Sequence, residues 1–325
     1  MRTLLSEIRL PIEQELKQFR SLFETELQTD SPILEEVLKY IRQKQGKMMR
    51  PVLFFLISKA FGKTTSATYH AALSIELLHT ASLIHDDVVD ESDKRRGQAS
   101  VNAMYNNKVS VLSGDYLLAL ALEQSVQTNN LPIVQKVSKL GQVLAQGELL
   151  QLSSVAGKLM NEETYLKIIY KKTAALFSAC SETAAISANC TPEDIESARL
   201  FGEYLGLCFQ IKDDIFDFFD SKEIGKPTGN DLKEGKLTLP VIYIINNLGL
   251  KEAETLAYKA KERRASEEEI ATLIELTKQH GGIEYATSVM LSYKKKAAEL
   301  LTLLPESEIK QALLLYLDLI VEREK

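Results

Sequence analysis

The sequence predicts an all-α protein, and two observations support this fold class. Apolar residues recur with the 3.6-residue period of a helix along most of the 325-residue chain, while Gly (15 residues) and Pro (8 residues) are sparse. No alternation of apolar and polar residues persists long enough to build a sheet. The composition, 45% hydrophobic and 26% charged, is that of a globular protein, and we expect one domain over residues 1–325.

The first half of the chain shows helical periodicity in six segments. We expect helices at residues 3–25, 32–44, 49–61, 67–91, 109–127 and 132–153. The segment 67–91 is apolar almost all round before its acidic end. Such a helix is typically buried in a bundle, so we expect it to be central.

The second half has clearer punctuation. Thr191, Pro192 and two acids form a helix start, and Gly281 and Gly282 mark a break. Residues 221–236 contain three glycines, a proline and several lysines, which predicts a loop. The region after residue 250 has the pattern of amphipathic outer helices. We expect helices at 162–188, 193–219, 237–247, 251–263, 267–279, 283–303 and 307–323.

Charge and cysteine usage exclude several classes of protein. The formal net charge of -6 argues against a general nucleic-acid binder. Cys180, Cys190 and Cys208 have no metal-binding spacing and indicate reduced thiols in a cytoplasmic protein. The N-terminal segment is interrupted by Arg, Glu and Pro, so it does not have the pattern of a signal peptide. The longest apolar stretches of the chain, residues 51–57 and 239–245, are too short to span a bilayer, so we expect no transmembrane segment.

One acidic motif, Asp-Asp-x-x-Asp, occurs twice. The aspartates are Asp86, Asp87, Asp90, Asp213, Asp214 and Asp217. Residues i and i+4 share a helix face, so each motif places two carboxylates one turn apart, where like charges repel. A cation would relieve this repulsion, and clusters of oxygen ligands suit Mg²⁺, which is commonly shared with substrate phosphates. The two motifs therefore predict a diphosphate held through several metal ions.

Basic residues that could contact phosphate oxygens lie beside these motifs and in other polar segments. They are Lys47, Arg50, Arg95, Arg96, Lys172, Lys226 and Lys236. Arg offers planar bidentate contacts, and Lys acts as a point charge. Together they provide the cations that an acidic protein needs in order to bind an anionic substrate.

Other chemistries find little support in the sequence. The segment 61–64 resembles the tail of a phosphate-binding loop, but Ile57 occupies the required glycine position. Glu76 and His79 match half of a di-iron site, and no second Glu-x-x-His exists. Metal-assisted departure of a diphosphate remains the favoured reaction. A metal-binding helical bundle without activity stays open as the non-enzymatic alternative.

At residues 40–245 the chain resembles the trans-prenyltransferases of the polyprenyl synthetase family, which make isoprenoid diphosphates. The matching motifs are GKMMRP (46–51), HTASLIHDDVVDESDKRRG (79–97), GD (114–115), GELLQL (147–152), KTA (172–174), FQIKDDIFD (209–217) and GKPTGNDLKEGKLTLP (225–240). The resemblance implies a barrel of antiparallel helices around a deep central cavity, usually in a homodimer. It also implies condensation of isopentenyl diphosphate with an allylic diphosphate.

The resemblance also implies roles for single residues. The six aspartates would hold two to three Mg²⁺ ions and, with Lys172, form the catalytic group. Isopentenyl diphosphate would be bound by Lys47, Arg50, His79 and Arg96. The allylic diphosphate would be bound by Arg95, Lys172, Thr173, Gln210 and Lys226.

Product length is predicted from two positions before the first motif. In the family, bulky aromatic residues at Ala81 and Ser82 would stop growth at short products, and here both residues are small. We therefore expect a long product of C30 to C50, as used in quinone side chains, and its delivery to a membrane is compatible with this expectation. A C15 to C20 synthase, a non-catalytic subunit of a heteromeric synthase, a terpene cyclase and a head-to-head condensing enzyme are the alternatives.

Overall fold

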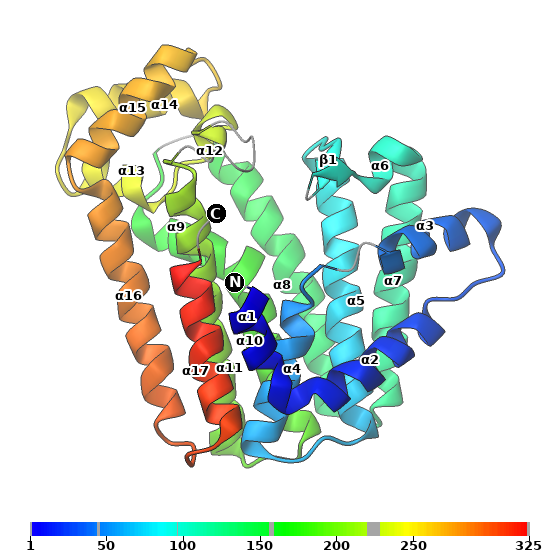
Figure 1. The fold of residues 1–325 in the computed structure, drawn as a ribbon. Coiled ribbons are helices and arrows are strands. Elements are labelled where there is room, and N and C mark those ends of the chain that lie inside the picture. The colour runs from blue at the N-terminus through cyan, green and yellow to red at the C-terminus, as the bar shows by residue number, and fades with distance from the viewer. Residues whose placement is uncertain (1, 44–45, 96, 156–158, 220–227, 324–325) are drawn as a thin grey trace.

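The computed structural model describes residues 2–43, 46–95, 97–155, 159–219 and 228–323, and long helices dominate these ranges. Most of them run alongside one another as a bundle (Figure 1). The all-α prediction is confirmed. In chain order the elements are α1 (Arg2–Arg9), η1 (Leu10–Ile12), α2 (Glu13–Glu26), α3 (Pro32–Gln43), α4 (Met49–Phe61), α5 (Ser66–Val89), β1 (Lys94–Arg95), β2 (Gln98–Ala99), α6 (Val101–Met104), α7 (Asn107–Gln127), α8 (Leu131–Val155), α9 (Glu162–Ile169), η2 (Tyr170–Ala174), α10 (Ala175–Ser187), α11 (Pro192–Phe216), α12 (Asn230–Lys233), α13 (Leu239–Asn246), α14 (Lys251–Lys261), α15 (Glu267–Gln279), α16 (Gly282–Leu301) and α17 (Glu308–Glu322).

The predicted helices match the observed ones except at two interruptions. The segment 3–25 is split by the 3₁₀ turn η1, which contains Pro11, because proline cannot continue the helical hydrogen-bond ladder. The segment 162–188 is split by η2, a five-residue π-helical turn. The short antiparallel β1–β2 hairpin and the one-turn helices α6 and α12 were not predicted.

Helix boundaries follow the capping residues of the sequence. Thr191 accepts a hydrogen bond from the backbone N–H of Asp194 at 3.2 Å, with Pro192 in the first turn, as predicted. Gly281 has φ of 77° and separates α15 from α16. Only glycine adopts this left-handed conformation without strain, so the predicted break falls where the backbone requires it.

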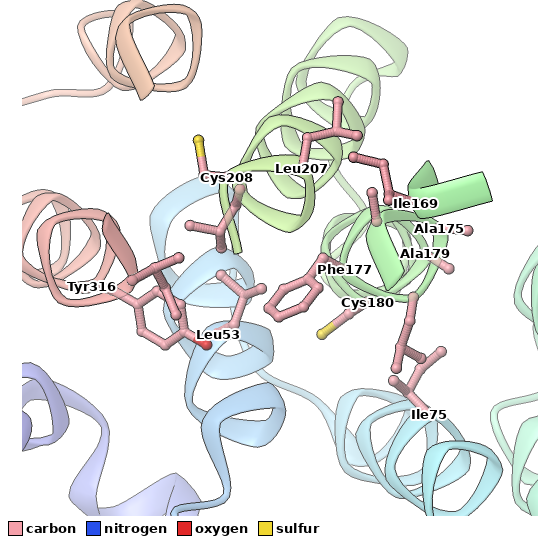
Figure 2. Close-up of a cluster of buried hydrophobic side chains, with 14 of the residues drawn as sticks. Leu53, Ile75, Ile169, Ala175, Phe177, Ala179, Cys180, Leu207, Cys208 and Tyr316 are labelled. Carbon is pink, nitrogen blue, oxygen red and sulfur yellow. The ribbon is translucent and has the colours of Figure 1, made fainter. Parts of the chain in front are cut away.

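The core lies between α4, α5, α10, α11 and α17, and Figure 2 shows part of it. Leu53, Ile75 and Phe177 belong to this core, and each is at most 2% exposed. Tyr316 of α17 is completely buried, and its hydroxyl donates to the Met49 carbonyl at 2.9 Å. This bond attaches α17 to the first turn of α4.

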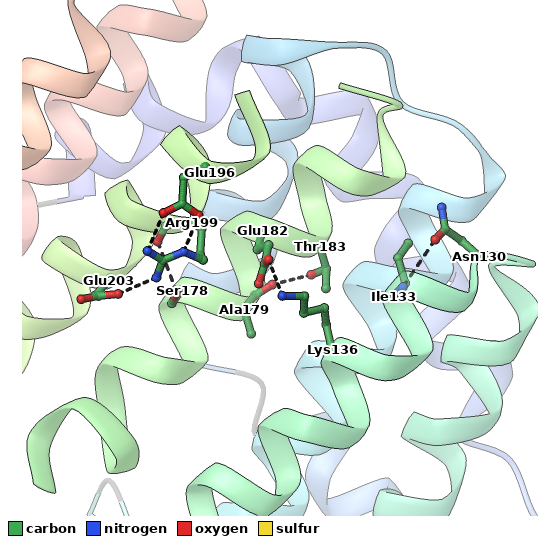
Figure 3. Close-up of polar contacts among 10 residues, drawn as sticks. All are labelled: Asn130, Ile133, Lys136, Ser178, Ala179, Glu182, Thr183, Glu196, Arg199 and Glu203. Carbon is green, nitrogen blue, oxygen red and sulfur yellow. Dashed lines mark hydrogen bonds and ion pairs between the residues drawn. The ribbon is translucent and has the colours of Figure 1, made fainter. Parts of the chain in front are cut away.

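Polar contacts tie three of the long helices together (Figure 3). Lys136 of α8 pairs with Glu182 of α10 at 2.6 Å. Ser178 of α10 donates to the Arg199 carbonyl of α11 at 3.2 Å. These contacts, together with the apolar core, fix α8, α10 and α11 relative to one another.

The two acidic motifs lie where long helices end. Asp90 caps the end of α5, and Asp217 caps the end of α11. In Figure 1 the strand β1, which follows α5, and α12, which follows α11, lie at the same end of the bundle. The fold therefore places both motifs at that end.

Candidate functional site

The first motif presents two carboxylates on one face of α5. Asp86 and Asp90 are one turn apart, and Asp90 is exposed. Burial raises the pKa of Asp86 to about 6, and the neighbouring Glu148 adds to the shift, while Lys172 opposes it. Asp86 thus sits among acids that favour a nearby cation.

The middle aspartate of the first motif has a different environment. Asp87 is only 3% exposed, and Arg95 of β1 donates to both of its carboxylate oxygens through Nε at 2.7 and 2.9 Å. A second guanidinium nitrogen lies 2.6 Å from Oδ1. The backbone N–H of Ser92 also donates to the Asp87 carbonyl. Asp87 therefore fixes the hairpin that follows α5 and orients Arg95.

In the second motif, too, the first aspartate is more exposed than the middle one. Asp213 is half-exposed and lies 2.6 Å from the Arg323 guanidinium at the end of α17. Asp214 is 4% exposed, and it accepts hydrogen bonds from the Tyr165 hydroxyl at 2.6 Å and the Gln210 amide at 2.8 Å. Burial, with Asp231 nearby, raises the pKa of Asp214 well above its usual value.

The last aspartate of the second motif organises the start of α12. The Asp217 carboxylate accepts the backbone N–H groups of Asn230 and Asp231 at 3.1 and 3.0 Å. Carboxylates are favourable at a helix N-terminus, where backbone N–H groups are otherwise unpaired. Burial and then Asp217 raise the pKa of Asp231 to about 6. Asp231 is thus a seventh acid of the cluster.

Lys172 and Thr173 lie within the π-helical turn η2. Such turns are rare and occur frequently at functional sites. A Cβ on Gly147 of α8 would lie 2.8 Å from the Lys171 Cβ and 3.0 Å from the Lys172 nitrogen, so only glycine allows α8 this close to η2. The next residue, Glu148, pairs with Lys172 at 2.6 Å, which directs this lysine toward Asp86.

The two motifs share electrostatic neighbours. Burial lowers the pKa of Lys236, but hydrogen bonding to Glu234 and the charges of Asp90 and Asp231 outweigh it and raise the pKa. Lys236 therefore interacts with the first motif through Asp90 and with the surroundings of the second through Asp231. A cavity of about 170 Å³ is lined by Lys172, Gln210, Asp214, Asp231 and Lys236, among others.

A second cavity, of about 350 Å³, lies beside the first motif. Its lining includes Gly46, His79, Asp87 and Arg95. His79, predicted to bind isopentenyl diphosphate, is 7% exposed and faces this space.

Two more of the residues predicted for isopentenyl diphosphate lie close together, Lys47 just before α4 and Arg50 in its first turn. Arg50 packs over the Phe177 ring, 5.6 Å from its centroid, and the Arg50 carbonyl accepts from the Cys180 thiol at 3.5 Å. The carbonyl of Lys47 accepts from the Arg9 guanidinium. The segment that carries both basic residues is therefore held by α1, α10 and α17.

Four further predicted residues have different outcomes. Arg96 and Lys226 lie outside the described residues. Ala81 is 2% exposed and belongs to the core, whereas Ser82 is partly exposed and donates to the His79 carbonyl at 2.9 Å. Neither Ala81 nor Ser82 lines either of the two cavities.

Sequence reasoning missed several residues that the structure brings to the site. Glu148 lies within the matched motif GELLQL and Asp231 within the matched glycine-rich segment, so the sequence could have identified both as candidate site residues. Tyr165 and Arg323 lie outside every recognised motif, and only the fold reveals their contacts with Asp214 and Asp213.

The donor set fits a metal ion that is shared with a diphosphate. Across the described ranges, no three His, Cys, Asp or Glu side chains come together as a ready metal site. Mg²⁺ commonly uses only one or two carboxylates and completes its coordination with substrate phosphates and water. The pair Asp86 and Asp90 suits this mode of binding and does not form a closed protein cage.

No helix in the described part of the chain is both long enough and apolar enough to cross a bilayer.

Comparison with known proteins finds relatives along almost the whole chain. Residues 31–277 match the polyprenyl synthetase family. The chain is 35% identical over 320 residues to octaprenyl diphosphate synthase of Haemophilus influenzae, covering 98% of this chain and 97% of that one. It is 52% identical to a solved geranylgeranyl pyrophosphate synthase from Bacteroides thetaiotaomicron, with a TM-score of 0.86 and coverage of 99% and 100%. A polyprenyl synthase from Caulobacter crescentus CB15, solved with calcium and isoprenyl diphosphate, is 32% identical with a TM-score of 0.90 and 98% coverage of both chains.

Proposed function

The chain belongs to the polyprenyl synthetase family and is a trans-prenyl diphosphate synthase that condenses isopentenyl diphosphate, and from this premise we propose its substrates, site roles and product. The allylic partner is a prenyl diphosphate such as farnesyl diphosphate, and the product is an all-trans polyprenyl diphosphate of C30 to C50 for quinone side chains. The proposed site rests on one observation. The two acidic motifs lie where their helices end, at the same end of the bundle, and Lys236 interacts with Asp90 of the first motif and with Asp231 beside the second.

We assign metal binding to the outer aspartates of the two motifs. Asp86, Asp90, Asp213 and Asp217 would hold two to three Mg²⁺ ions against the allylic diphosphate. When bound, Mg²⁺ stabilises the charge that develops on the departing diphosphate. Asp87 and Asp214, predicted with the other four as metal ligands, are buried and bonded to protein donors, so we assign them to orienting Arg95 and Gln210.

The basic residues divide between the two substrates. Lys172, Arg95 and Gln210 face the allylic diphosphate, with Thr173 and Lys226 completing the group that the sequence predicts. Lys47, Arg50, His79 and Arg96 bind isopentenyl diphosphate. Positive side chains held before the reaction stabilise the leaving diphosphate without reorganisation during it.

The reaction follows from this arrangement. The bond between the allylic carbon and its diphosphate oxygen breaks, leaving an allylic cation and a free diphosphate. The double bond of isopentenyl diphosphate forms a new carbon–carbon bond with the cation, and the departing diphosphate accepts the proton that is then lost. The apolar walls formed by core residues exclude the water that would quench the cation.

Two observations bear on product length and favour different answers. Ala81 and Ser82 are small, and Ser82 is partly exposed one turn before Asp86, which supports a long product. The 52% identity to a geranylgeranyl pyrophosphate synthase favours a second candidate, a C20 product. Because the two candidates differ only in the length of the tail, sizing of the product decides between them.

We also propose a homodimer with α7 and α8 at its interface. Near both ends, these helices expose large apolar side chains, namely Val111, Leu112, Leu122, Val126, Leu131, Leu149 and Leu152. Exposed apolar side chains that gather on one face are typical of a protein–protein interface, and a second copy of the same face would bury these. A monomeric mass in light scattering would contradict this interface.

The unpaired thiols Cys180, Cys190 and Cys208 support a cytoplasmic location.

The test of the proposed function is incubation of the purified protein with MgCl₂, farnesyl diphosphate and labelled isopentenyl diphosphate. We expect Mg²⁺-dependent incorporation and, by mass spectrometry, products of C30 to C50. A terminal C20 product would support the second candidate. The absence of any product without a partner protein would support a non-catalytic subunit.

A further inference from the structure

A chain of hydrogen bonds connects Tyr165 of α9 to Thr173 of η2 through two residues of α11. The Tyr165 hydroxyl donates to Asp214 Oδ2 at 2.6 Å, and the Gln210 amide nitrogen donates to Asp214 Oδ1 at 2.8 Å. The Thr173 hydroxyl donates to Gln210 Oε1 at 2.7 Å. Two of these four residues, Gln210 and Thr173, are in the predicted allylic diphosphate group, and Tyr165 was missed.

The chain is buried at its Tyr165 end. Tyr165 is 2% exposed and Asp214 is 4% exposed. Burial, followed by the charge of Asp214, raises the pKa of Tyr165 well above its usual range, so the phenol keeps its proton and can donate it. A buried Asp214 side chain without donors would be unfavourable, so the two hydrogen bonds stabilise this part of the fold.

The direction of each bond follows from the donor inventory of the side chains. Asp214 Oδ1 is an acceptor, so the Gln210 amide must present its N–H group to Asp214. A proton on Oδ2 would leave Oδ1 an acceptor, so this orientation holds both for the ionised carboxylate and for the acid protonated on Oδ2. The opposite end of the amide, Oε1, then faces Thr173, which must donate.

This orientation decides which group can serve the diphosphate. The Thr173 hydroxyl hydrogen is already committed to Gln210, whereas Gln210 keeps a second amide hydrogen. Gln210, Tyr165 and Asp214 all line the 170 Å³ cavity that also contains Lys172 and Lys236. Gln210 therefore offers a donor to the same cavity as the two lysines.

We propose that Tyr165 is a positioning residue which, through Asp214, holds the Gln210 amide with its N–H toward the allylic diphosphate, while Thr173 acts through Gln210. This inference rests on the proposed function and goes beyond it by assigning a role to a residue outside every motif. Without the phenol, Asp214 would lose one of its two donors, and the amide would lose its fixed orientation.

The test compares wild type with Tyr165→Phe and with a matched control, Tyr285→Phe. The Tyr285 hydroxyl also donates to a carboxylate oxygen, Glu162 Oε2, at 2.8 Å, but this bond joins a different pair of helices, α16 and α9. Two quantities are measured: binding of inorganic pyrophosphate with MgCl₂ by calorimetry, and kcat and KM for farnesyl diphosphate. Thermal unfolding monitors the fold of each variant.

Tyr165→Phe should weaken pyrophosphate binding and raise KM about tenfold, the effect of one hydrogen bond to a charged group, with kcat changed much less. Tyr285→Phe should leave both constants unchanged. Gln210→Met should match Tyr165→Phe, and the double variant should bind no more weakly than Gln210→Met alone, because both changes remove the same contact.

Two results would overturn the inference. One is pyrophosphate binding of wild-type strength in Tyr165→Phe or, if that variant does not fold, in Gln210→Met. The other is a double variant whose loss is the product of the two single losses. Failure of the wild-type protein to form prenyl products would instead contradict the proposed function, so the two failures are distinguishable.

Discussion

The Arg323 guanidinium at the end of α17 lies 2.6 Å from the Asp213 carboxylate and 4.0 Å from the centroid of the Phe209 ring. Its nitrogen also donates to the Phe209 carbonyl at 3.0 Å. The C-terminal helix thus supplies a cation to the first aspartate of the second motif. Any metal ion at Asp213 must compete with this cation.

This competition predicts the effect of Arg323→Met. The substitution removes the charge and keeps an apolar side chain against Phe209. The Mg²⁺ concentration for half-maximal activity should fall about two- to fivefold, the range expected for a partly exposed ion pair worth ~0.5–1 kcal/mol. A Mg²⁺ titration measures it, with Arg264→Met, an exposed arginine paired with Glu262, as the control. An unchanged or higher Mg²⁺ requirement would show that Arg323 does not compete with the metal.

The close approach of α8 to the π-helical turn predicts a contrast between two glycines of α8. Gly147→Ala places a methyl group against Lys171 and Lys172, and we expect a loss of ~1–3 kcal/mol in the free energy of unfolding and at least a tenfold lower kcat/KM. Gly141→Ala has nothing within 4 Å of the new methyl group. It should be neutral or stabilise the helix by up to ~1 kcal/mol. Equal behaviour of the two variants in denaturation and turnover would refute this role for Gly147.

The environment of Asp86 predicts a pH dependence of stability. Burial raises its pKa in the folded protein to about 6, above the ordinary carboxyl value, so the folded state binds the proton more tightly than the unfolded chain. The stability from this group is therefore present at pH 4 and is lost as the pH rises through about 6.

Asp86→Asn removes this dependence. Without Mg²⁺, the variant should match wild type at pH 4 and exceed it at pH 7.5 by an amount on the order of 1–2 kcal/mol in denaturant unfolding. Asp93→Asn, which changes an exposed aspartate nearby, is the control and should show no such trend. A constant difference between Asp86→Asn and wild type across this range would exclude the raised pKa.

Product length can be tested on α5. Ser82→Phe places a ring one turn before Asp86, and we expect the main product to shorten by one or more isoprene units, since one extended unit is roughly as long as one helical turn. Leu83→Phe changes the neighbouring residue, which lines the 350 Å³ cavity beside the first motif, and should leave the length distribution unchanged. Mass spectrometry of the products reads both variants. A Ser82→Phe enzyme with the wild-type distribution would show that the tail does not pass this position.

Much of the fold and the location of the aspartates could be predicted from sequence, because helix periodicity and the DDxxD spacing are local properties. Periodicity placed the ends of α4 and α15 correctly. It missed the π-helical turn because residues 162–188 contain no glycine or proline to mark an interruption, and the extra residue is accommodated by the packing of α8 and α11.

The different environments of the aspartates within each motif could not be predicted from the sequence. Spacing shows that Asp86 and Asp90 share a face, but it does not show what Asp87 faces. The environment of Asp87 depends on Arg95, which lies in a hairpin of two-residue strands. The environment of Asp214 depends on Tyr165, which is 49 residues away in the chain. Such partners are set by tertiary packing and leave no local pattern in the sequence.

Turnover by single outer-aspartate variants tests most directly whether the two motifs act on one diphosphate. Labelled isopentenyl diphosphate, farnesyl diphosphate and MgCl₂ are supplied to wild type, Asp86→Asn and Asp213→Asn. We expect each substitution to lower kcat by about a thousandfold or more while the helical circular dichroism spectrum is retained, since each removes a metal ligand at the leaving group. Wild-type turnover in either variant would contradict a shared metal–diphosphate site.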